Sequence, residues 1–380
     1  MAEWKALYLL STAHSRGRMR RYRWDIVRSM AWKNNQPANH YVADDYLLKV
    51  DLSTSWDWKI NISEVAVNKT KVPSTGTAPP SLISGALYQG STNDPRIYMY
   101  GGTTSWWNTT SPTFQAPQTK EYSLWSYDTQ SKVWGQHDIS DAAPWRPSVG
   151  ATTEAPELGL TFWYGGEMDS GSSTETQFFG NQVKVFLEGM VVYNTSSQVA
   201  VNISTQPADQ GQPRTRGSMQ YIPGIGEKGI LVYMGGTYRP ANEIDNNVAV
   251  NYLDMSELDI FDVASLFKKP SNTSTAWHHQ KATGDVPLPR GQFCAVTASA
   301  PDNSSHNIYI YGGWNEHTYT YFDDVYVLSL PSFTWTMLYG EGSGPRFGHT
   351  CHLVGNRQML TVGGVSTLDV KCECLAVTDL

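Results

Sequence analysis

The sequence predicts an all-β fold built from one repeated unit of four antiparallel strands. Three observations support this fold class: five Gly-Gly doublets that each close a short apolar run, a further β-rich run after each doublet, and a recurring tryptophan. The 380 residues are 12% aromatic, with 14 Trp and 21 Tyr beside 32 Gly and 20 Pro. This composition favours strands and turns over helices.

The doublets mark the end of the second strand in each unit. A strand that ends in Gly-Gly can adopt backbone angles denied to other residues, and it leaves room for a neighbouring strand to pass closely. The doublets lie 64, 70, 77 and 51 residues apart, which fits repeats of about 50 residues with loops of variable length. They are Gly101 and Gly102, Gly165 and Gly166, Gly235 and Gly236, Gly312 and Gly313, and Gly363 and Gly364.

The residues around the doublets complete the unit. A third strand follows each doublet, at residues 124–128, 190–194, 258–262, 325–329 and 375–379. A fourth strand carries Trp134 or Trp335 in two units, and Trp277 comes later, beyond an insertion. A turn containing Pro and Arg, as at Pro289 and Pro345, precedes the first strand.

This order of turn, strand, strand ending in Gly-Gly, third strand and Trp-bearing strand resembles the kelch repeat over residues 44–380. In kelch proteins each unit folds as one four-stranded blade of a β-propeller, so the resemblance implies a single propeller domain of about six blades. The likeness is to fungal secreted or surface kelch proteins and to the galactose oxidase propeller. It is most specific at residues 304–313 and 346–355. A Gly-rich β-sandwich is the alternative, but it does not explain the recurring tryptophan.

Both ends of the pattern are incomplete. Residues 45–51 resemble a third strand with no doublet before it, and Leu380 directly follows the last third strand. The pattern yields 21 strands, three fewer than six full blades, and residues 3–11 are a candidate for one irregular strand. We therefore expect incomplete first and last blades, an irregular basic extension at residues 1–43, and a truncated or divergently spliced form of a six-bladed propeller.

Charge is distributed unevenly along the chain. The net charge of -7 argues against binding to nucleic acid. Residues 1–33 carry eight Lys or Arg against two acidic residues, which makes them net +6 and leaves -13 on residues 34–380. The basic cluster at residues 16–23 is compatible with nucleic acid, anionic lipid or a transit peptide, but we expect an extension without a function of its own.

The signals for cellular location conflict. Seven Asn-x-Ser/Thr sites, some of which can be accidental, indicate passage through the secretory pathway. Only residues 6–10 form an apolar run near the N-terminus, shorter than the ~7–15 residues of a signal peptide, and no transmembrane segment is expected. We expect an extracellular or cell-surface protein, with the cytoplasm as the alternative. The sites are Asn61, Asn68, Asn108, Asn194, Asn202, Asn272 and Asn303.

All four cysteines lie in the last quarter of the chain. Cys351 and Cys372 flank the last doublet and are the disulfide candidates, although four cysteines permit three pairings. The rival interpretation is a zinc site formed by His349, Cys351, Cys372 and Cys374, whose spacing matches no standard zinc motif. We expect a disulfide or free thiols, and no metal or cofactor.

The loops that follow the doublets are candidates for binding. They join equivalent strands and should therefore converge on one face, where Trp, Tyr and Arg are the residue types favoured at binding hot spots. The alternative is that these side chains pack within their own loops. The candidates are Trp106, Trp107, Tyr238, Arg239, Trp314, Asn315, His317 and Tyr319.

Residues that suggest catalysis are few. The acidic pairs at residues 44–45 and 323–324 occupy the same place in the repeat, which indicates a structural role. The histidines at 278–279 lack a nucleophile partner and are expected in a solvated loop, and no local motif indicates a copper site like that of galactose oxidase. The first hypothesis is a non-catalytic scaffold that binds a protein or glycan. The second is an enzyme or enzyme accessory that acts on a small molecule, for example in fungal secondary metabolism.

Overall fold

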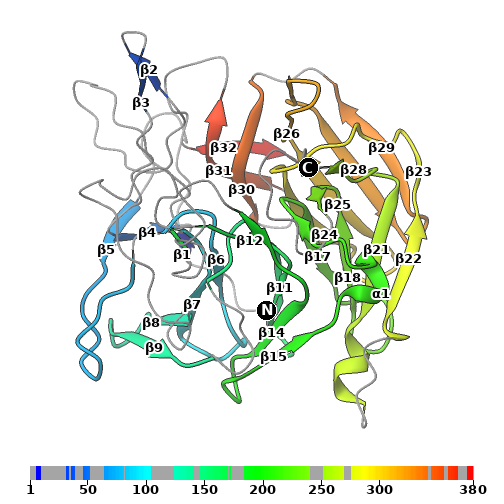
Figure 1. Cartoon of the computed structure of the whole chain (residues 1–380). Helices are drawn as coiled ribbons and strands as arrows, with labels where there is room; N and C mark the ends of the chain where they lie inside the picture. The colour runs from blue at the N-terminus through cyan, green and yellow to red at the C-terminus, as the bar shows by residue number, and fades with distance from the viewer. Residues whose placement is uncertain are drawn as a thin grey trace.

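The computed structural model describes residues 6–9, 31–33, 36–38, 46–51, 64–80, 82–103, 124–139, 146–169, 171–172, 184–239, 251–268, 275–340, 344–354, 358–366 and 375–379. Within these residues the chain forms six main antiparallel sheets, which we number 1 to 6 in chain order. Figure 1 shows that the sheets follow one another around a common centre.

The four central sheets have four consecutive strands each, as the repeat predicts. Sheet 2 is β6 (Ala86–Tyr88), β7 (Arg96–Tyr100), β8 (Leu124–Asp128) and β9 (Trp134–His137). Sheet 3 is β10 (Ala151–Ala155), β11 (Leu160–Tyr164), β14 (Met190–Asn194) and β15 (Val199–Ile203). Sheet 4 is β17 (Ser218–Ile222), β18 (Ile230–Met234), β21 (Glu257–Asp262) and β22 (Trp277–Lys281). Sheet 5 is β24 (Cys294–Ser299), β25 (His306–Tyr311), β28 (Val325–Leu330) and β29 (Thr334–Tyr339), with β23 (Thr283–Gly284) parallel to β29.

The first and last sheets contain three described strands each. Sheet 1 is β1 (Ala6–Leu9), β4 (Tyr46–Asp51) and β5 (Glu64–Asn68), and sheet 6 is β30 (Arg346–Val354), β31 (Gln358–Ser366) and β32 (Leu375–Asp379). The expected irregular strand within residues 3–11 is thus confirmed as β1, which pairs antiparallel with β4.

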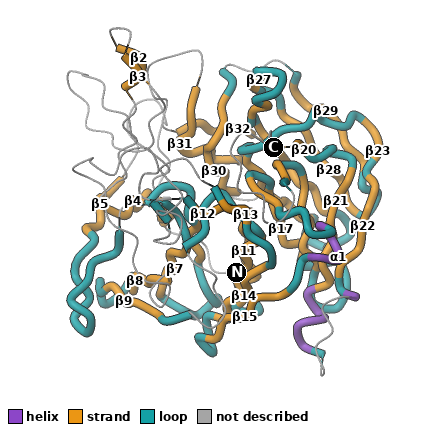
Figure 2. Tube along the Cα trace, viewed as in Figure 1, coloured by secondary structure: helices purple, strands orange, loops and turns teal. Residues whose placement is uncertain are grey.

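The remaining elements are short. Small ribbons are formed by β2 (Ala31–Lys33) with β3 (Gln36–Ala38), β12 (Glu167–Met168) with β13 (Val185–Phe186), β19 (Thr237–Tyr238) with β16 (Arg214–Thr215) and β20 (Asn251–Tyr252), and β26 (Trp314–Asn315) with β27 (Thr320–Tyr321). Helical structure is limited to α1 (Gln206–Asp209) and the 3-10 helix η3 (Val263–Phe267) in the described part of the chain (Figure 2). No helix among these residues is long and apolar enough to cross a membrane.

The Gly-Gly doublets allow close backbone contact between neighbouring units. Both glycines have positive φ in all five doublets, for example 68° at Gly312 and 97° at Gly313. A Cβ on Gly312 would collide with the carbonyl oxygen of Arg346 in the next unit, and one on Gly313 would lie 2.9 Å from that of Gly291. The N–H of Gly313 donates to Arg346 O at 2.8 Å. The doublets therefore serve the purpose that the sequence predicts, close approach of neighbouring backbone.

The recurring tryptophans also join neighbouring sheets. The indole N–H of Trp134 donates to Asn68 O in sheet 1 at 3.0 Å, and that of Trp277 donates to Ser204 O beside sheet 3 at 3.1 Å. Trp335 donates to Met255 O in the turn before β21, at 3.0 Å. Buried side chains from adjacent sheets form the apolar cores between them.

Candidate functional site

The innermost strands of sheets 2 to 6 surround a central cavity of about 590 Å³. Strands β6, β10, β17, β24 and β30 line it in succession, and each contacts the next. Its polar lining includes Glu154, Gln220 and His349. In a propeller this space is the central channel, enclosed by the first strand of each blade.

A chain of backbone hydrogen bonds runs around one mouth of the channel. In each of five units, one residue near the start of the innermost strand adopts a left-handed conformation, with φ between 49° and 66°. In the last four of these units, the N–H of this residue donates to the carbonyl of its counterpart in the preceding unit, at 2.7 to 3.1 Å. These residues are Ser84, Val149, Arg216, Gln292 and Gly348. The sequence carries one signal for this series of bonds, not used in the predictions above: in three units the residue follows the arginine of the Pro-Arg turn by two positions, at Arg216, Gln292 and Gly348.

Side chains within the channel connect successive inner strands. The Glu154 carboxylate accepts the backbone N–H of Gln89 at 2.6 Å. Gln220 donates to Ala295 O at 3.3 Å and accepts the Thr297 hydroxyl at 3.0 Å. Burial raises the pKa of Glu154 to about 7, because the low-dielectric channel wall disfavours the charged carboxylate.

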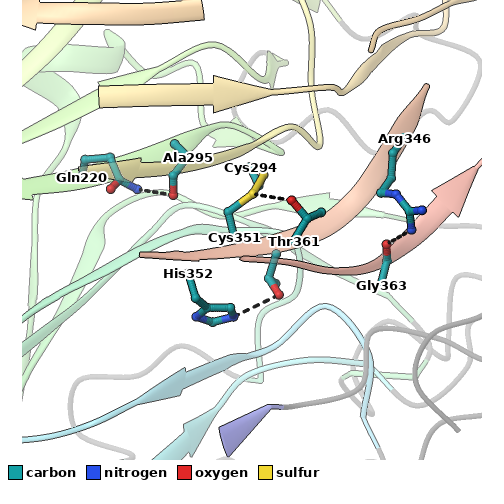
Figure 3. Close-up of a disulfide and its surroundings, with 9 residues drawn as sticks. Gln220, Cys294, Ala295, Arg346, Cys351, His352, Thr361 and Gly363 are labelled. Atoms are coloured by element: carbon teal, nitrogen blue, oxygen red, sulfur yellow. Dashed lines mark hydrogen bonds between the residues drawn. A yellow bond between two sulfur atoms is a disulfide. The ribbon is translucent and has the colours of Figure 1, made fainter. Parts of the chain in front are cut away.

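A disulfide joins β24 to β30 across the junction of sheets 5 and 6. It pairs Cys294 with Cys351, whose Cα atoms lie 5.4 Å apart (Figure 3). The predicted pairing of Cys351 with Cys372 is therefore wrong, since Cys351 faces the neighbouring inner strand; Cys372 itself lies outside the described residues. Cys294 and Cys351 follow their Pro-Arg turns by similar distances, a signal that places them side by side once inner strands are known to be neighbours.

Two histidines lie on β30, His349 buried and His352 half-buried. His349 is 5% exposed, and its ring lies edge-on to Tyr311 at 5.2 Å between centroids. Burial, together with the charge of Arg346, lowers the pKa of His349 to about 3. Burial also lowers the pKa of His352 to about 4, so both rings are neutral at physiological pH.

An aromatic cluster forms beside the channel mouth, on the face that carries the loops after the doublets. Trp314 stacks on Tyr321 at 5.8 Å and on Phe347, from the next unit, at 5.2 Å between centroids. Tyr321 and Phe347 are 5.6 Å apart. Tyr319, in the same loop, is 81% exposed. We call Trp314, Tyr319, Tyr321 and Phe347 the aromatic patch.

The other described loop candidates are largely packed. Asn315 is 8% exposed and donates to Pro289 O at 2.8 Å, which gives it a structural role. His317 lies edge-on to Tyr252 at 5.3 Å, and Arg239 is buried over Phe186 at 5.2 Å. Tyr238 is half-buried in β19. Trp106 and Trp107 lie outside the described residues.

Within the acidic pair at 323–324, Asp324 has the structural role expected of the pair. Arg290 is fully buried and forms an ion pair with Asp324, with Nη2 to Oδ2 at 3.0 Å. Its guanidinium also lies over the ring of Phe322, 3.7 Å from the centroid. The pair at 44–45 lies outside the described residues.

The expectation of a loop at residues 278–279 is wrong, because both histidines lie in strand β22, although both are exposed to solvent as expected. The ring of His279 contacts Glu257 at 2.5 Å and Asp259 at 3.3 Å. Partial burial opposes the charged ring, but these carboxylates outweigh it and raise the pKa of His279. Both histidines border a second cavity, of about 330 Å³, together with Asp209 and Arg214.

The described glycosylation candidates are at the surface or partly buried. Asn68, Asn202 and Asn303 are exposed, while Asn194 is half-buried and accepts the backbone N–H of Ser196 at 2.9 Å. Asn61, Asn108 and Asn272 lie outside the described residues. All seven sites stay predictions.

The chain matches known proteins over this repeated region. Residues 228–380 match the family model described as the KLHDC2/KLHL20/DRC7 Kelch-repeats domain. A kelch repeat-containing protein of Arthroderma benhamiae is 28% identical over 369 residues, a match that covers 87% of this chain and 49% of the relative. The chain thus spans about half the length of that relative.

A solved structure supports the fold. The structure of YjhT, a kelch propeller, matches with a TM-score of 0.52 at 14% identity, over 88% of this chain and 91% of the other. At this identity the likeness concerns the fold alone. The repeated doublets, the consecutive four-stranded sheets and these matches agree: the chain has the fold of a β-propeller, and its residues 228–380 match a kelch-repeat domain.

Proposed function

We propose that the chain is a binding scaffold, without catalytic activity of its own, that recognises a protein or a glycan through the face carrying the aromatic patch. The kelch repeat is a fold used for protein interaction, which supports the general role. The aromatic patch is the observation that carries the proposal. Aromatic rings bury much area and retain hydrogen-bonding groups, so they serve as anchors for proteins and sugars alike.

The loop that presents the patch is held by neighbouring units on both sides. Trp314 stacks on Phe347 of sheet 6, while the Glu316 N–H donates to the Tyr252 hydroxyl in the unit of sheet 4, at 3.0 Å. A loop fixed in this way loses little conformational entropy when a partner binds. The exposed Tyr319 therefore projects from a preorganised support.

The test compares a patch variant with a matched control on the opposite end of the strands. Immobilised wild-type protein, Tyr319→Ala/Tyr321→Ala and Phe267→Ala are incubated with secreted proteins of the source organism and with a panel of oligosaccharides. Phe267 is 50% exposed and follows β21 at its far end. We expect one reproducible partner whose binding falls at least about tenfold in the patch variant and is unchanged in the control. Equal binding by wild type and the patch variant would refute the proposal.

We also propose that the protein acts outside the cell. The Cys294–Cys351 disulfide and the exposed sequons at Asn68, Asn202 and Asn303 support this location. Protein isolated from its source should lose mass on treatment with an enzyme that removes N-linked glycans. An unchanged mass, together with free thiols in the isolated protein, would contradict the proposal.

A further inference from the structure

Three ligand-type side chains meet at the wall of the channel, where β24 and β30 run side by side. The sulfur atoms of Cys294 and Cys351 and a ring nitrogen of His349 all lie within 4.8 Å of one another. His349 and Cys351 are two residues apart on β30 and therefore share one face of the strand, while Cys294 reaches them from the adjacent sheet.

The imidazole of His349 is unusual for a buried polar group. Among the described residues neither ring nitrogen forms a hydrogen bond of good geometry, although the residue is only 5% exposed and the backbone of Tyr311 lies near the ring. Buried polar groups are nearly always paired, so an unpaired one calls for an explanation. A metal-binding position between this imidazole and the two sulfur atoms would explain it, because the ring nitrogen would then have a metal ion to bind.

We propose that the dithiol form of the protein binds one thiophilic divalent cation, such as Zn²⁺, through Cys294, Cys351 and His349. Two thiolates and an imidazole are ligands that Zn²⁺ prefers, and three protein ligands leave a fourth position open to water or a ligand. All three residues line the central cavity, so the open position faces the channel. The Thr361 hydroxyl lies 3.6 Å from the sulfur of Cys351 and can donate to its thiolate.

The disulfide and the metal site are alternative states of the same cysteines. A thiol reductant opens the bond by exchange: two reductant thiols become a disulfide, and the two electrons they release convert Cys294 and Cys351 to thiols. Binding of the cation then displaces the two thiol protons into solvent. Every chain passes through this dithiol state before its disulfide closes. The reverse exchange with a small-molecule disulfide returns the two electrons to it, converts it to two thiols with protons from solvent, releases the cation and restores the covalent link between sheets 5 and 6.

Cobalt(II) is the probe for the test, because it is coloured in thiolate sites. The full chain is reduced, freed of reductant without air, and titrated with Co²⁺. We expect one equivalent to produce thiolate-to-cobalt charge-transfer absorption with the visible bands of a tetrahedral site, and Zn²⁺ to displace it. The oxidised protein should show neither absorption. Failure of the reduced wild type to develop these bands would overturn the proposal.

Variants identify the ligands. Cys294→Ser and Cys351→Ser should each abolish the charge-transfer bands, and His349→Ala should weaken cobalt binding more than about tenfold, since even changes beyond the ligands cost that much. Cys372→Ser/Cys374→Ser is the matched control and should bind as wild type. Loss of the bands in that control, or their persistence in Cys294→Ser/Cys351→Ser, would refute this ligand set. Zn²⁺ should also raise the melting temperature of the reduced wild type and not of the oxidised protein, a readout independent of cobalt colour.

Discussion

The buried pair of Arg290 and Asp324 offers the sharpest test of how one unit is held together. The guanidinium of Arg290 is fully buried, and besides Asp324 it donates to Gly312 O at 3.1 Å and to Leu288 O at 3.0 Å. Gly312 is the first glycine of the unit's own doublet. The pair thus joins the turn before β24, the end of β25 and the start of β28. The substitution Asp324→Ala removes the carboxylate and leaves the cation in place.

The expected cost is large because Arg290 has no access to water. Removing one partner of a buried ion pair costs about 3–5 kcal/mol, since the remaining charge stays desolvated and uncompensated. Asp324 is 14% exposed on its side chain, which places the estimate near the lower end, at about 3 kcal/mol. Replacing both residues, in Arg290→Met/Asp324→Ala, removes the stranded charge. The double variant should therefore lose less stability than the two single variants together.

Urea unfolding followed by tryptophan fluorescence measures these free energies of unfolding. The control is Asp323→Ala, which removes the neighbouring carboxylate; no ion pair of Asp323 occurs among the described residues. We expect Asp324→Ala to lower the free energy of unfolding by about 3 kcal/mol and Asp323→Ala to change it by less than about 0.5 kcal/mol. Equal effects of the two substitutions, or additive effects in the double variant, would refute the assignment of Asp324 as a structural partner.

Three further predictions concern stability. Because burial raises the pKa of Glu154 to about 7, its neutral form stabilises the fold at low pH, and this contribution is lost as the pH rises through 7. In urea unfolding, the free energy of unfolding of Glu154→Gln should therefore rise relative to that of wild type between about pH 5 and pH 8, by up to about 3 kcal/mol. Because Glu154 is partly exposed, solvent screening lowers this figure. The exposed Glu188→Gln is the control and should show no such trend. Cys294→Ser/Cys351→Ser opens a link that spans 57 residues and should cost about 4 kcal/mol against oxidised wild type; a melting temperature within 2 °C of wild type would contradict this. Gly313→Ala places a Cβ at a φ of 97° against Gly291 O, so calorimetry should show a loss of about 1–3 kcal/mol or more, and an unchanged transition would argue against the interlocking role of the doublets.

Much of the fold could be predicted from local sequence because the repeat encodes its own boundaries. The apolar run before Gly312 predicts a strand that ends at the doublet, and β25 ends at Tyr311. The recurring tryptophans indicate a fourth strand, although their bond to the preceding sheet becomes visible only in three dimensions. The pairing of β1 with β4 could not be predicted from local sequence, since about 40 residues separate the two strands and β1 carries no repeat motif of its own.

The site was harder to predict because it depends on contacts between units. The cysteines nearest the last doublet, Cys351 and Cys372, suggest a pairing within one blade. The structure instead pairs Cys351 with Cys294 from the neighbouring inner strand, at a sequence separation of 57. His278 and His279 are polar residues typical of a loop. They lie in a strand instead, where the His279 ring binds the carboxylates of Glu257 and Asp259 on the adjacent β21. Asn315 likewise looks like a binding residue in the sequence, because its hydrogen bond to Pro289 O can be seen only in the structure.

The same contacts explain how a β-propeller can present variable loops from a constant frame. The second glycine in each of the first four doublets, and four of the five left-handed residues near the start of an inner strand, donate their N–H to backbone of an adjacent unit. These bonds require a glycine or a turn conformation but no particular side chain. The loops that carry the aromatic patch begin directly after the doublets, at the points where these bonds are made. Their starting positions relative to one another are therefore set by backbone alone. Substitutions such as Tyr319→Ala can then change what the face binds without altering the frame, which is why binding and stability should separate cleanly in the patch variant.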